Sequence, residues 1–297
     1  MGAPSGAPAA SRSRNRYHGA TMLPLVFSHE AKSRHWPLVT ICLIGLNILI
    51  FLFEVSLGDG FDVFIQDWGL LPARVEAEVT LHNLATVVTS EFMHAGWLHI
   101  FFNMWFLYIF GDSLEDALGR WWYLMLYLVA GFFGSMAYIA ASGGTPIPAV
   151  GASGAVSGVL GASLVIWPTA RLNVPGLLLA WFSAGLLLTL AVMVFGGAGF
   201  LVGLPAALLV FFAMLVWFVT KGGFLRGIFG LQGTPAWFVF GMYLGLNLWS
   251  GVATIVDPVM GGGVGYWAHI GGFVTGALFG WLFPKTPIAL HRRRAFD

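Results

Sequence analysis

The chain has 297 residues, of which 58% are hydrophobic and only 9% are charged, and its mean hydropathy is +0.82. A soluble domain carries about 25% charged residues, so this composition excludes an ordinary water-soluble fold and predicts a protein solvated mainly by lipid. The formal net charge of +1 gives no support for a nucleic-acid-binding surface. Cys42 is the only cysteine of the sequence, which excludes an internal disulfide.

Residues 1–35 are predicted to form a flexible basic arm. The first twenty residues are rich in glycine, alanine, proline, serine and arginine and contain no acidic residue, which is typical of disorder. They lack the apolar segment of a cleavable secretory signal. An organelle transit peptide is an alternative interpretation, and Met22 is an alternative start.

A membrane-spanning helix needs about 20 apolar residues, and the sequence offers several such segments. The candidates cover about 36–55, 97–112, 121–141, 152–168, 176–196, 198–220, 236–252 and 264–284. The loop at about 56–96 mixes acidic, aromatic and apolar residues, which favours a structured and partly embedded outer loop. The fifth and sixth candidates are the most uniformly apolar and read as a hairpin turned by glycines.

Lysine and arginine indicate the orientation of these spans. Basic residues cluster in the N-terminal arm and in the C-terminal tail, residues 285–297. Because basic loops stay on the cytoplasmic side, we expect both termini to be cytoplasmic, which requires an even number of spans. Eight spans leave only Arg74 of the 14 basic residues in an outer loop. Six spans would also satisfy this parity, so parity alone leaves both numbers open.

Three groups of polar residues interrupt the apolar spans, each near the expected outer end. His94, His99 and Asn103 open the second span, and His99 and Asn103 are one helical turn apart on one face. Ser153 opens the fourth span in a Gly-Ala-Ser-Gly turn, and His269 lies near the start of the last span. Because polar residues in a bilayer are costly and often mark function, we expect these groups to meet at one depth.

These residue types suit acyl transfer. A serine hydroxyl needs a base to remove its proton, and a neutral histidine serves that purpose near pH 7, so Ser153 and His269 are the candidates. The developing oxyanion needs donors, which His99, Asn103 and the amide of Ser153 at a helix N-terminus can supply. No carboxylate is apparent that could serve as the third member beside the serine and the histidine, so we expect a dyad rather than a triad.

Glycine spacing favours close packing of the fourth span against the last. Rows of small residues four apart let helix backbones approach closely in lipid, and Ser153 could reach His269 only if the two helices came close. The glycines in question are Gly154, Gly158 and Gly161 in the fourth span and Gly272, Gly276 and Gly280 in the last.

Each signal has a simpler explanation when it is taken alone. Small residues pack membrane helices everywhere, and Ala155 stands where a Gly-x-Ser-x-Gly elbow requires glycine. A single membrane histidine is more often a structural hydrogen-bonding residue. His94 and His99 do not form a His-Glu-x-x-His motif, and no third ligand is obvious, so we do not expect a zinc site.

Other polar residues of the spans have plain interpretations. Ser157 is predicted to serve in packing. Glu54 and Asp257 lie at outer span ends, where we expect them to be solvated. Glu115 and Asp116, beside Arg120, are expected to form an ion pair in a loop or a capping set.

Taken together, these motifs resemble the rhomboid family of intramembrane serine proteases. TSEFMHAGWLHIFFNMWFLYIFGDSLEDALGRWWYLMLYLVAG, residues 89–131, is similar to the family's second and third core helices. VGASGAVSGVLGA, residues 150–162, resembles its nucleophile helix, and YWAHIGGFVTGALFG, residues 266–280, its last core helix. The resemblance covers roughly residues 36–168 and 235–284.

The resemblance implies an all-α polytopic membrane protein with a rhomboid-like six-helix core plus an extra helical hairpin, about eight spans in all. The membrane domain would cover residues 36–284, with the extra hairpin at about 172–234 inserted between core helices four and five. The implied activity is that of an intramembrane serine endopeptidase, which cleaves transmembrane segments of other proteins near the outer face without metal or cofactor. The implied location is a bacterial inner membrane.

The resemblance also implies roles for single residues. Ser153 would be the nucleophile and His269 the base. The oxyanion hole would consist of His99, Asn103 and the Ser153 amide. The supporting residues would be His94, Gly151, Gly154 and Gly272. Some family members place an aromatic residue four positions after the nucleophile, against the histidine. That position is Ser157 here, so we expect His269 to be held differently.

Two other classes of function were weighed. A non-catalytic rhomboid-like protein that binds or escorts client helices would use the same shape but would not need both Ser153 and His269. A transporter would predict an inverted repeat with broken helices, which is not evident in the sequence. The substrate and the oligomeric state stay open at this point.

Overall fold

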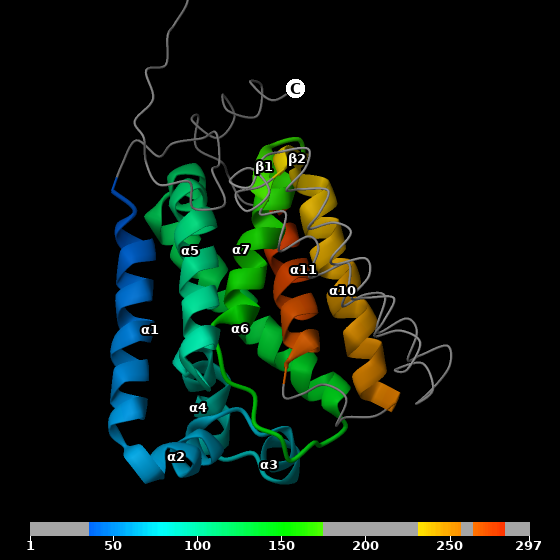
Figure 1. Ribbon diagram of the computed structural model, residues 1–297. Helices are drawn as coiled ribbons and strands as arrows, with labels where there is room; N and C mark the ends of the chain where they lie inside the picture. Colours follow the sequence, from blue (N-terminus) through cyan, green and yellow to red (C-terminus); the bar gives the residue numbers. More distant parts are fainter. Residues whose placement is uncertain (1–35, 175–230, 257–263, 283–297) are drawn as a thin grey trace, which may run out of the picture.

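The computed structural model describes residues 36–174, 231–256 and 264–282. In this part of the chain, long helices stand side by side as a bundle, and short helices cover one end of it (Figure 1). The long helices are α1 (Leu38–Ser56), α5 (Trp97–Leu118), α6 (Arg120–Ser142), α7 (Ser153–Ile166), α10 (Ala236–Val256) and α11 (Tyr266–Leu282).

These helices coincide with six of the predicted spans, and the all-α polytopic fold class is confirmed. The largest difference is in α5, which continues past residue 112 to Leu118 and ends at Gly119, where φ is +81°. The other two predicted spans, at about 176–196 and 198–220, lie outside the described residues. The predicted basic arm and basic tail lie outside them as well.

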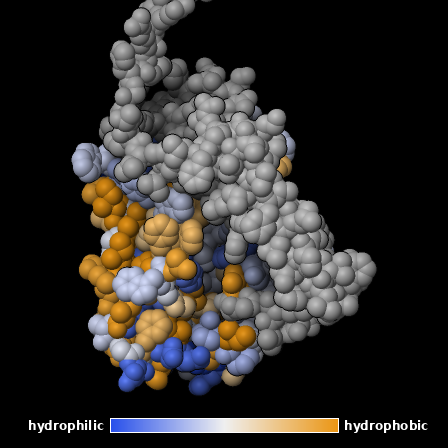
Figure 2. Space-filling view, viewed as in Figure 1, coloured by the Kyte–Doolittle hydropathy of each residue, from blue (hydrophilic) through white to orange (hydrophobic). Residues whose placement is uncertain are grey.

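Several described helices are suited to a bilayer. By length and composition, α1, α6 and residues Ala236–Thr254 of α10 are long and apolar enough to cross it, while α7 is apolar but shorter, with 14 residues. Large apolar side chains of α1, among them Leu46, Leu49 and Leu52, face outward. Figure 2 shows hydrophobic surface along the α1 side and hydrophilic surface near the α2–α4 end.

The predicted structured loop between the first two spans is confirmed. It consists of η1 (Gly58–Gly60), α2 (Phe61–Trp68), α3 (Pro72–Ala77), α4 (Leu81–Thr89) and η2 (Ser90–Phe92). The Arg74 guanidinium donates to the carbonyl oxygens of Gln66, Asp67 and Gly69 at 2.7–3.2 Å and so ties α3 to the end of α2. The described bundle begins and ends at the opposite end from this loop (Figure 1).

A two-stranded antiparallel ribbon, which the sequence did not predict, joins the end of α7 to the start of α10. Strand β1 (Arg171–Val174) pairs with β2 (Leu231–Pro235), with Val174 opposite Leu231. The ribbon therefore places Val174 and Leu231 side by side. The extra hairpin predicted at about 172–234 falls almost wholly within 175–230, which lies outside the described residues.

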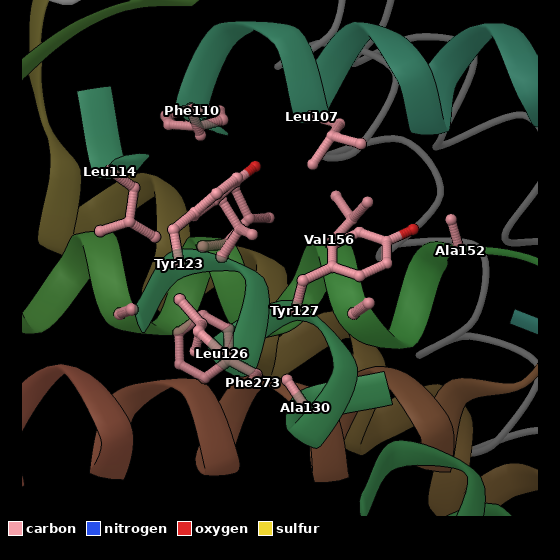
Figure 3. Close-up of a cluster of buried hydrophobic side chains, with 14 of the residues drawn as sticks. Leu107, Phe110, Leu114, Tyr123, Leu126, Tyr127, Ala130, Ala152, Val156 and Phe273 are labelled. Carbon is pink, nitrogen blue, oxygen red and sulfur yellow. The ribbon is translucent and has the colours of Figure 1, made fainter. Parts of the chain in front are cut away.

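Helix α7 forms the centre of the bundle, and α11 packs against it at very short range. A Cβ on Gly272 would collide with the carbonyl oxygen of Gly154, and a Cβ on Gly276 with that of Gly158. The close packing expected from the glycine spacing is therefore present. The apolar cluster around α7 is drawn in Figure 3 and includes Leu107, Phe110, Leu114, Tyr123, Leu126, Tyr127, Val156 and Phe273.

A buried carboxylate fixes α1 against α5. The Glu115 side chain is 4% exposed and accepts hydrogen bonds from the amides of Val39 and Thr40, at 3.0 and 2.9 Å, and from the Thr40 hydroxyl at 2.9 Å. The Arg120 guanidinium lies 3.7 Å away. The carboxylate thus satisfies amides at the N-terminus of α1, which lack intrahelical partners, and the predicted capping role is confirmed.

Candidate active site

Ser153 is the first residue of α7 and follows a firmly held turn. Gly151 has φ of +127°, a conformation that residues with a side chain rarely adopt. Its amide donates to the carbonyl oxygen of Ser90 at 2.8 Å, and Ala149 pairs through its backbone with Leu70. Two points of the outer loop therefore fix the turn that presents Ser153.

The structure brings Ser153 and His269 into hydrogen-bond contact although they are far apart in the sequence. The distance from Ser153 Oγ to His269 Nε2 is 2.8 Å. His269 lies in the first turn of α11, and the contact between α11 and α7 depends on glycines that let the backbones touch. A serine hydroxyl in this position can pass its proton to the imidazole.

Asn247 of α10 completes a chain of hydrogen bonds that sequence reasoning missed. Its Oδ1 lies 2.7 Å from His269 Nδ1, and its Nδ2 donates to the carbonyl oxygen of Tyr243 at 2.8 Å. Because the amide nitrogen faces a carbonyl, the amide oxygen must face the imidazole and accept from Nδ1–H. This arrangement leaves the lone pair of Nε2 directed at Ser153, which is the tautomer that a general base needs.

His99 and Asn103 of α5 approach the same turn at Gly151. A Cβ on Gly151 would lie 2.7 Å from His99 Nε2 and 3.6 Å from Asn103 Nδ2. Asn103 is buried, and its Nδ2 has no hydrogen-bond partner within the described residues. A free, buried donor beside the nucleophile is suited to a developing oxyanion, as is the N-terminal amide of α7.

His94 and Glu54 form a buried contact that corrects one expectation. Glu54 was expected to be solvated, but it is 0% exposed, because the outer loop folds back over the end of α1. Its Oε2 accepts from the backbone amide of His94 at 3.1 Å. The His94 ring lies edge-on to His99 at 5.2 Å, so it supports the loop that leads into α5. Burial, with a smaller contribution from His99, lowers the pKa of His94 to about 3.

No described cluster of three His, Cys, Asp or Glu side chains could hold a metal ion, a statement that covers residues 36–174, 231–256 and 264–282. The described residues can supply a base-activated serine with hydrogen-bond donors near it. Ser153, His269 and His99 lie in the first turns of α7, α11 and α5, and α5 and α11 begin toward the end of the bundle that α2–α4 cover (Figure 1).

Comparison with known proteins gives consistent matches. Residues 81–198 match the rhomboid domain. Rhomboid protease GluP of Bacillus subtilis is 34% identical over 131 residues, which are 44% of this chain and 25% of that protein. The presenilin-associated rhomboid-like protein of human mitochondria is 32% identical over 142 residues, 46% of this chain and 37% of that protein. Rhomboid-like protein 11 of Arabidopsis thaliana chloroplasts is 28% identical over 123 residues, 40% of this chain and 42% of that protein.

The chain therefore carries a rhomboid domain. It covers only about a quarter of the length of Rhomboid protease GluP, and the match to the rhomboid domain includes Ser153 but ends before His269. These relatives include bacterial, mitochondrial and chloroplast proteins, so the match and the apolar helices support an integral membrane protein without naming the membrane.

This rhomboid holds its histidine with an aromatic residue from another helix. The Tyr243 ring of α10 lies 6.3 Å from the His269 ring at an interplanar angle of 30°. Its hydroxyl is 2.6 Å from Ser157 Oγ, and Ser157 also donates to the carbonyl oxygen of Ser153 at 2.6 Å. Ser157 therefore does more than pack: it anchors a tyrosine that covers the imidazole, and the expectation that His269 is held differently is explained.

Proposed function

We propose that this rhomboid is an intramembrane serine endopeptidase in which Ser153 is the nucleophile and His269 the general base. The observation that carries the proposal is the continuous hydrogen-bonded chain from Ser153 through His269 to Asn247. Asn247 acts as a positioning residue that fixes the tautomer and the ring orientation of His269. An amide cannot balance the charge of an imidazolium as a carboxylate does, so the catalytic pair is a dyad with a neutral orienting residue.

The proposed reaction proceeds in two halves. As the Ser153 oxygen attacks the scissile carbonyl carbon, His269 Nε2 takes the hydroxyl proton and then gives it to the departing amine, which leaves an ester on Ser153. Water then attacks this ester, His269 takes a proton from the water and returns it to Ser153, and the carboxylic acid product leaves. Both tetrahedral intermediates place negative charge on the former carbonyl oxygen.

The oxyanion of these intermediates would be bound by His99, Asn103 and the amide of Ser153. The free donor of Asn103 supports this role, because in the resting state it has no described partner that substrate would have to displace. The short approach of His99 to Gly151 explains why a side chain at position 151 would be excluded. Gly154 and Gly272 act indirectly, because their contact sets the distance between Ser153 and His269.

The proposed substrates are transmembrane segments of other proteins, cleaved near the outer face. A peptide bond must leave its helix before a nucleophile can reach it, so segments with small or helix-breaking residues are favoured. We further propose a bacterial inner membrane as the location, with a cytoplasmic arm at 1–35, a membrane domain at 36–284 and a cytoplasmic tail at 285–297. The alternative is a non-catalytic rhomboid that binds or escorts client helices.

Cleavage of a panel of transmembrane substrates in proteoliposomes tests the proposal. Wild type should cleave at least one substrate, while Ser153→Ala and His269→Ala should not. Ser163→Ala is the matched control, because Ser163 is a buried serine of the same helix that donates only to the carbonyl oxygen of Val159, at 2.8 Å. Normal cleavage by Ser153→Ala would refute the assignment. Retention of a client by wild type and His269→Ala alike, with no cleavage by either, would favour the non-catalytic alternative.

A further inference from the structure

A pocket opens beside Ser153 between η2, α6 and the start of α11. The space between atoms, together with the open solvent at the mouth of the pocket, amounts to about 430 Å³. Among the residues that line it are Glu91, Gly131, Ser135, Gly151, Ser153 and Ala268. The nucleophile therefore forms part of the wall of this pocket, and Glu91, Gly131 and Ser135 in the same wall have no part in the reaction described above.

Glu91 of η2 is the acidic residue in this wall. Its side chain is 4% exposed, and neither carboxylate oxygen has a hydrogen-bond partner within the described residues. The carboxylate presses against Gly131, where a Cβ would collide with it. The carbonyl oxygen of Gly131 in turn lies 3.9 Å from the position of a Cβ on Gly154, the residue that follows Ser153. One glycine thus separates the carboxylate from the backbone of the nucleophile turn.

Nothing in the described lining of the pocket compensates this carboxylate. The lining contains no lysine, arginine or histidine. The Ser135 hydroxyl donates to the carbonyl oxygen of Val87 at 3.3 Å rather than to Glu91. Tyr127 interacts electrostatically with Glu91, but its phenol is uncharged and cannot neutralise the carboxylate. Because an unpaired buried charge is costly, burial raises the pKa of Glu91 to about 8, and this side chain stays protonated near neutral pH while the pocket is empty. An entering group that brings positive charge and N–H donors would release that proton and pair with the carboxylate.

We propose that Glu91 makes this pocket a subsite for a positively charged side chain, that of a lysine or arginine on the acyl side of the scissile bond. The inference rests on the proposed endopeptidase function. In the ester intermediate the acyl carbon is bonded to Ser153 Oγ, so the side chain of the same residue must lie next to Ser153. The described lining does not include His269, which protonates the leaving amine, and this places the pocket on the acyl side.

Selectivity follows from the unsatisfied acceptor. A lysine or arginine ionises Glu91 and forms a charge-assisted hydrogen bond with it, whereas an aliphatic side chain of similar length leaves the protonated carboxyl group buried and without a partner. A net gain of about 1.4 kcal/mol corresponds to a tenfold preference. Substrates would then carry a basic residue at the membrane border, next to the bond that is cleaved.

Peptidyl phosphonate probes that differ in one side chain test this inference. Such probes bond to the serine oxygen and carry only the acyl-side residue, here lysine or the uncharged norleucine. Labelling rates of purified protein in liposomes are compared for wild type, Glu91→Gln and Glu78→Gln. Glu78 is the matched control, because it is an exposed glutamate of the same outer loop and does not line the pocket.

The readout is the ratio of the lysine-probe rate to the norleucine-probe rate. Wild type and Glu78→Gln should prefer the lysine probe about tenfold, and Glu91→Gln should lose that preference. Thermal unfolding of the same samples shows whether Glu91→Gln is folded, and Glu91→Ala provides a second variant if it is not. Equal ratios in wild type and the Glu91 variants would overturn this inference alone. Absence of Ser153 labelling by both probes would overturn the proposed function, and the inference with it.

Discussion

The imidazole of His269 is held by Asn247, with 2.7 Å between His269 Nδ1 and Asn247 Oδ1. Asn247 belongs to α10, while the nucleophile belongs to α7 and the base to α11. Three helices therefore each supply one member of the hydrogen-bonded chain, and the register of α10 against the other two decides whether the base is oriented. This relationship leads to the first prediction.

Replacing Asn247 should lower the rate of the chemical step. Asn247→Ala removes the acceptor that fixes the His269 tautomer, and the loss of one hydrogen bond of this kind should reduce kcat about tenfold. Asn247→Asp keeps an acceptor in the same place and should retain more activity than Asn247→Ala.

Steady-state cleavage in proteoliposomes measures the activity of both Asn247 variants. Thr254→Ala on the same helix is the control, since the Thr254 hydroxyl donates to the carbonyl oxygen of Gly251 within its own helix. A change confined to KM, or equal loss in both Asn247 variants, would count against a positioning role.

Tyr243 and Ser157 should act as one unit. Tyr243→Phe and Ser157→Ala each remove the hydrogen bond of 2.6 Å between the two hydroxyls, while the ring of residue 243 can still cover His269. The double variant should therefore lose about as much activity as either single variant, with a coupling energy of about 1 kcal/mol. A double-mutant cycle on kcat/KM measures this coupling. Strictly additive losses would show that the tyrosine and the serine act independently.

The contact of α7 with α11 should tolerate no side chain at Gly276. A Cβ there collides with the carbonyl oxygen of Gly158, so Gly276→Ala should force the helices apart and lower stability by about 1–3 kcal/mol. Gly245→Ala is the matched control, because a Cβ on this glycine of α10 meets nothing within 4 Å. Thermal unfolding in detergent should show a lower Tm for Gly276→Ala only. Equal Tm values for the two variants would contradict the packing described here.

Glu91 should make stability depend on pH. Burial raises the pKa of Glu91 from 4.5 to about 8, so between these values the folded state keeps a proton that the unfolded state releases. Stability attributable to Glu91 is therefore lost as the pH rises through this range, by a few kcal/mol in total. Glu91→Gln cannot titrate, so the Tm of this variant minus that of wild type should grow from about pH 5 to about pH 8. A difference that stays constant over this range would mean that Glu91 titrates normally.

Hydrophobic runs predicted the described spanning helices because a bilayer imposes a minimum length of apolar sequence. The motifs around His99, Ser153 and His269 likewise singled out residues that the structure brings together, since each motif combines a costly polar residue with glycines that permit close approach. The ribbon β1–β2 carried no comparable signal, because its pairing joins segments more than fifty residues apart.

Asn247 and Tyr243 were missed for a different reason. They lie four residues apart on one face of α10, and a buried amide in an apolar span is a signal that deserved a functional hypothesis. Glu54 was misjudged because its position at the end of a span suggested solvation, whereas the folded outer loop covers it. Such errors arise where a residue's environment is supplied by a segment that is distant in the sequence.

The most direct test of the central claim is the site of covalent labelling by a fluorophosphonate, found by mass spectrometry of the protein in liposomes. Because phosphonylation requires an activated serine and no knowledge of the substrate, it reports on the Ser153–His269 pair itself. Our account predicts a phosphonate ester on Ser153 in wild type and in Ser163→Ala, and loss of labelling in His269→Ala. An unlabelled wild-type protein, or labelling of Ser153 that persists unchanged in His269→Ala, would contradict it.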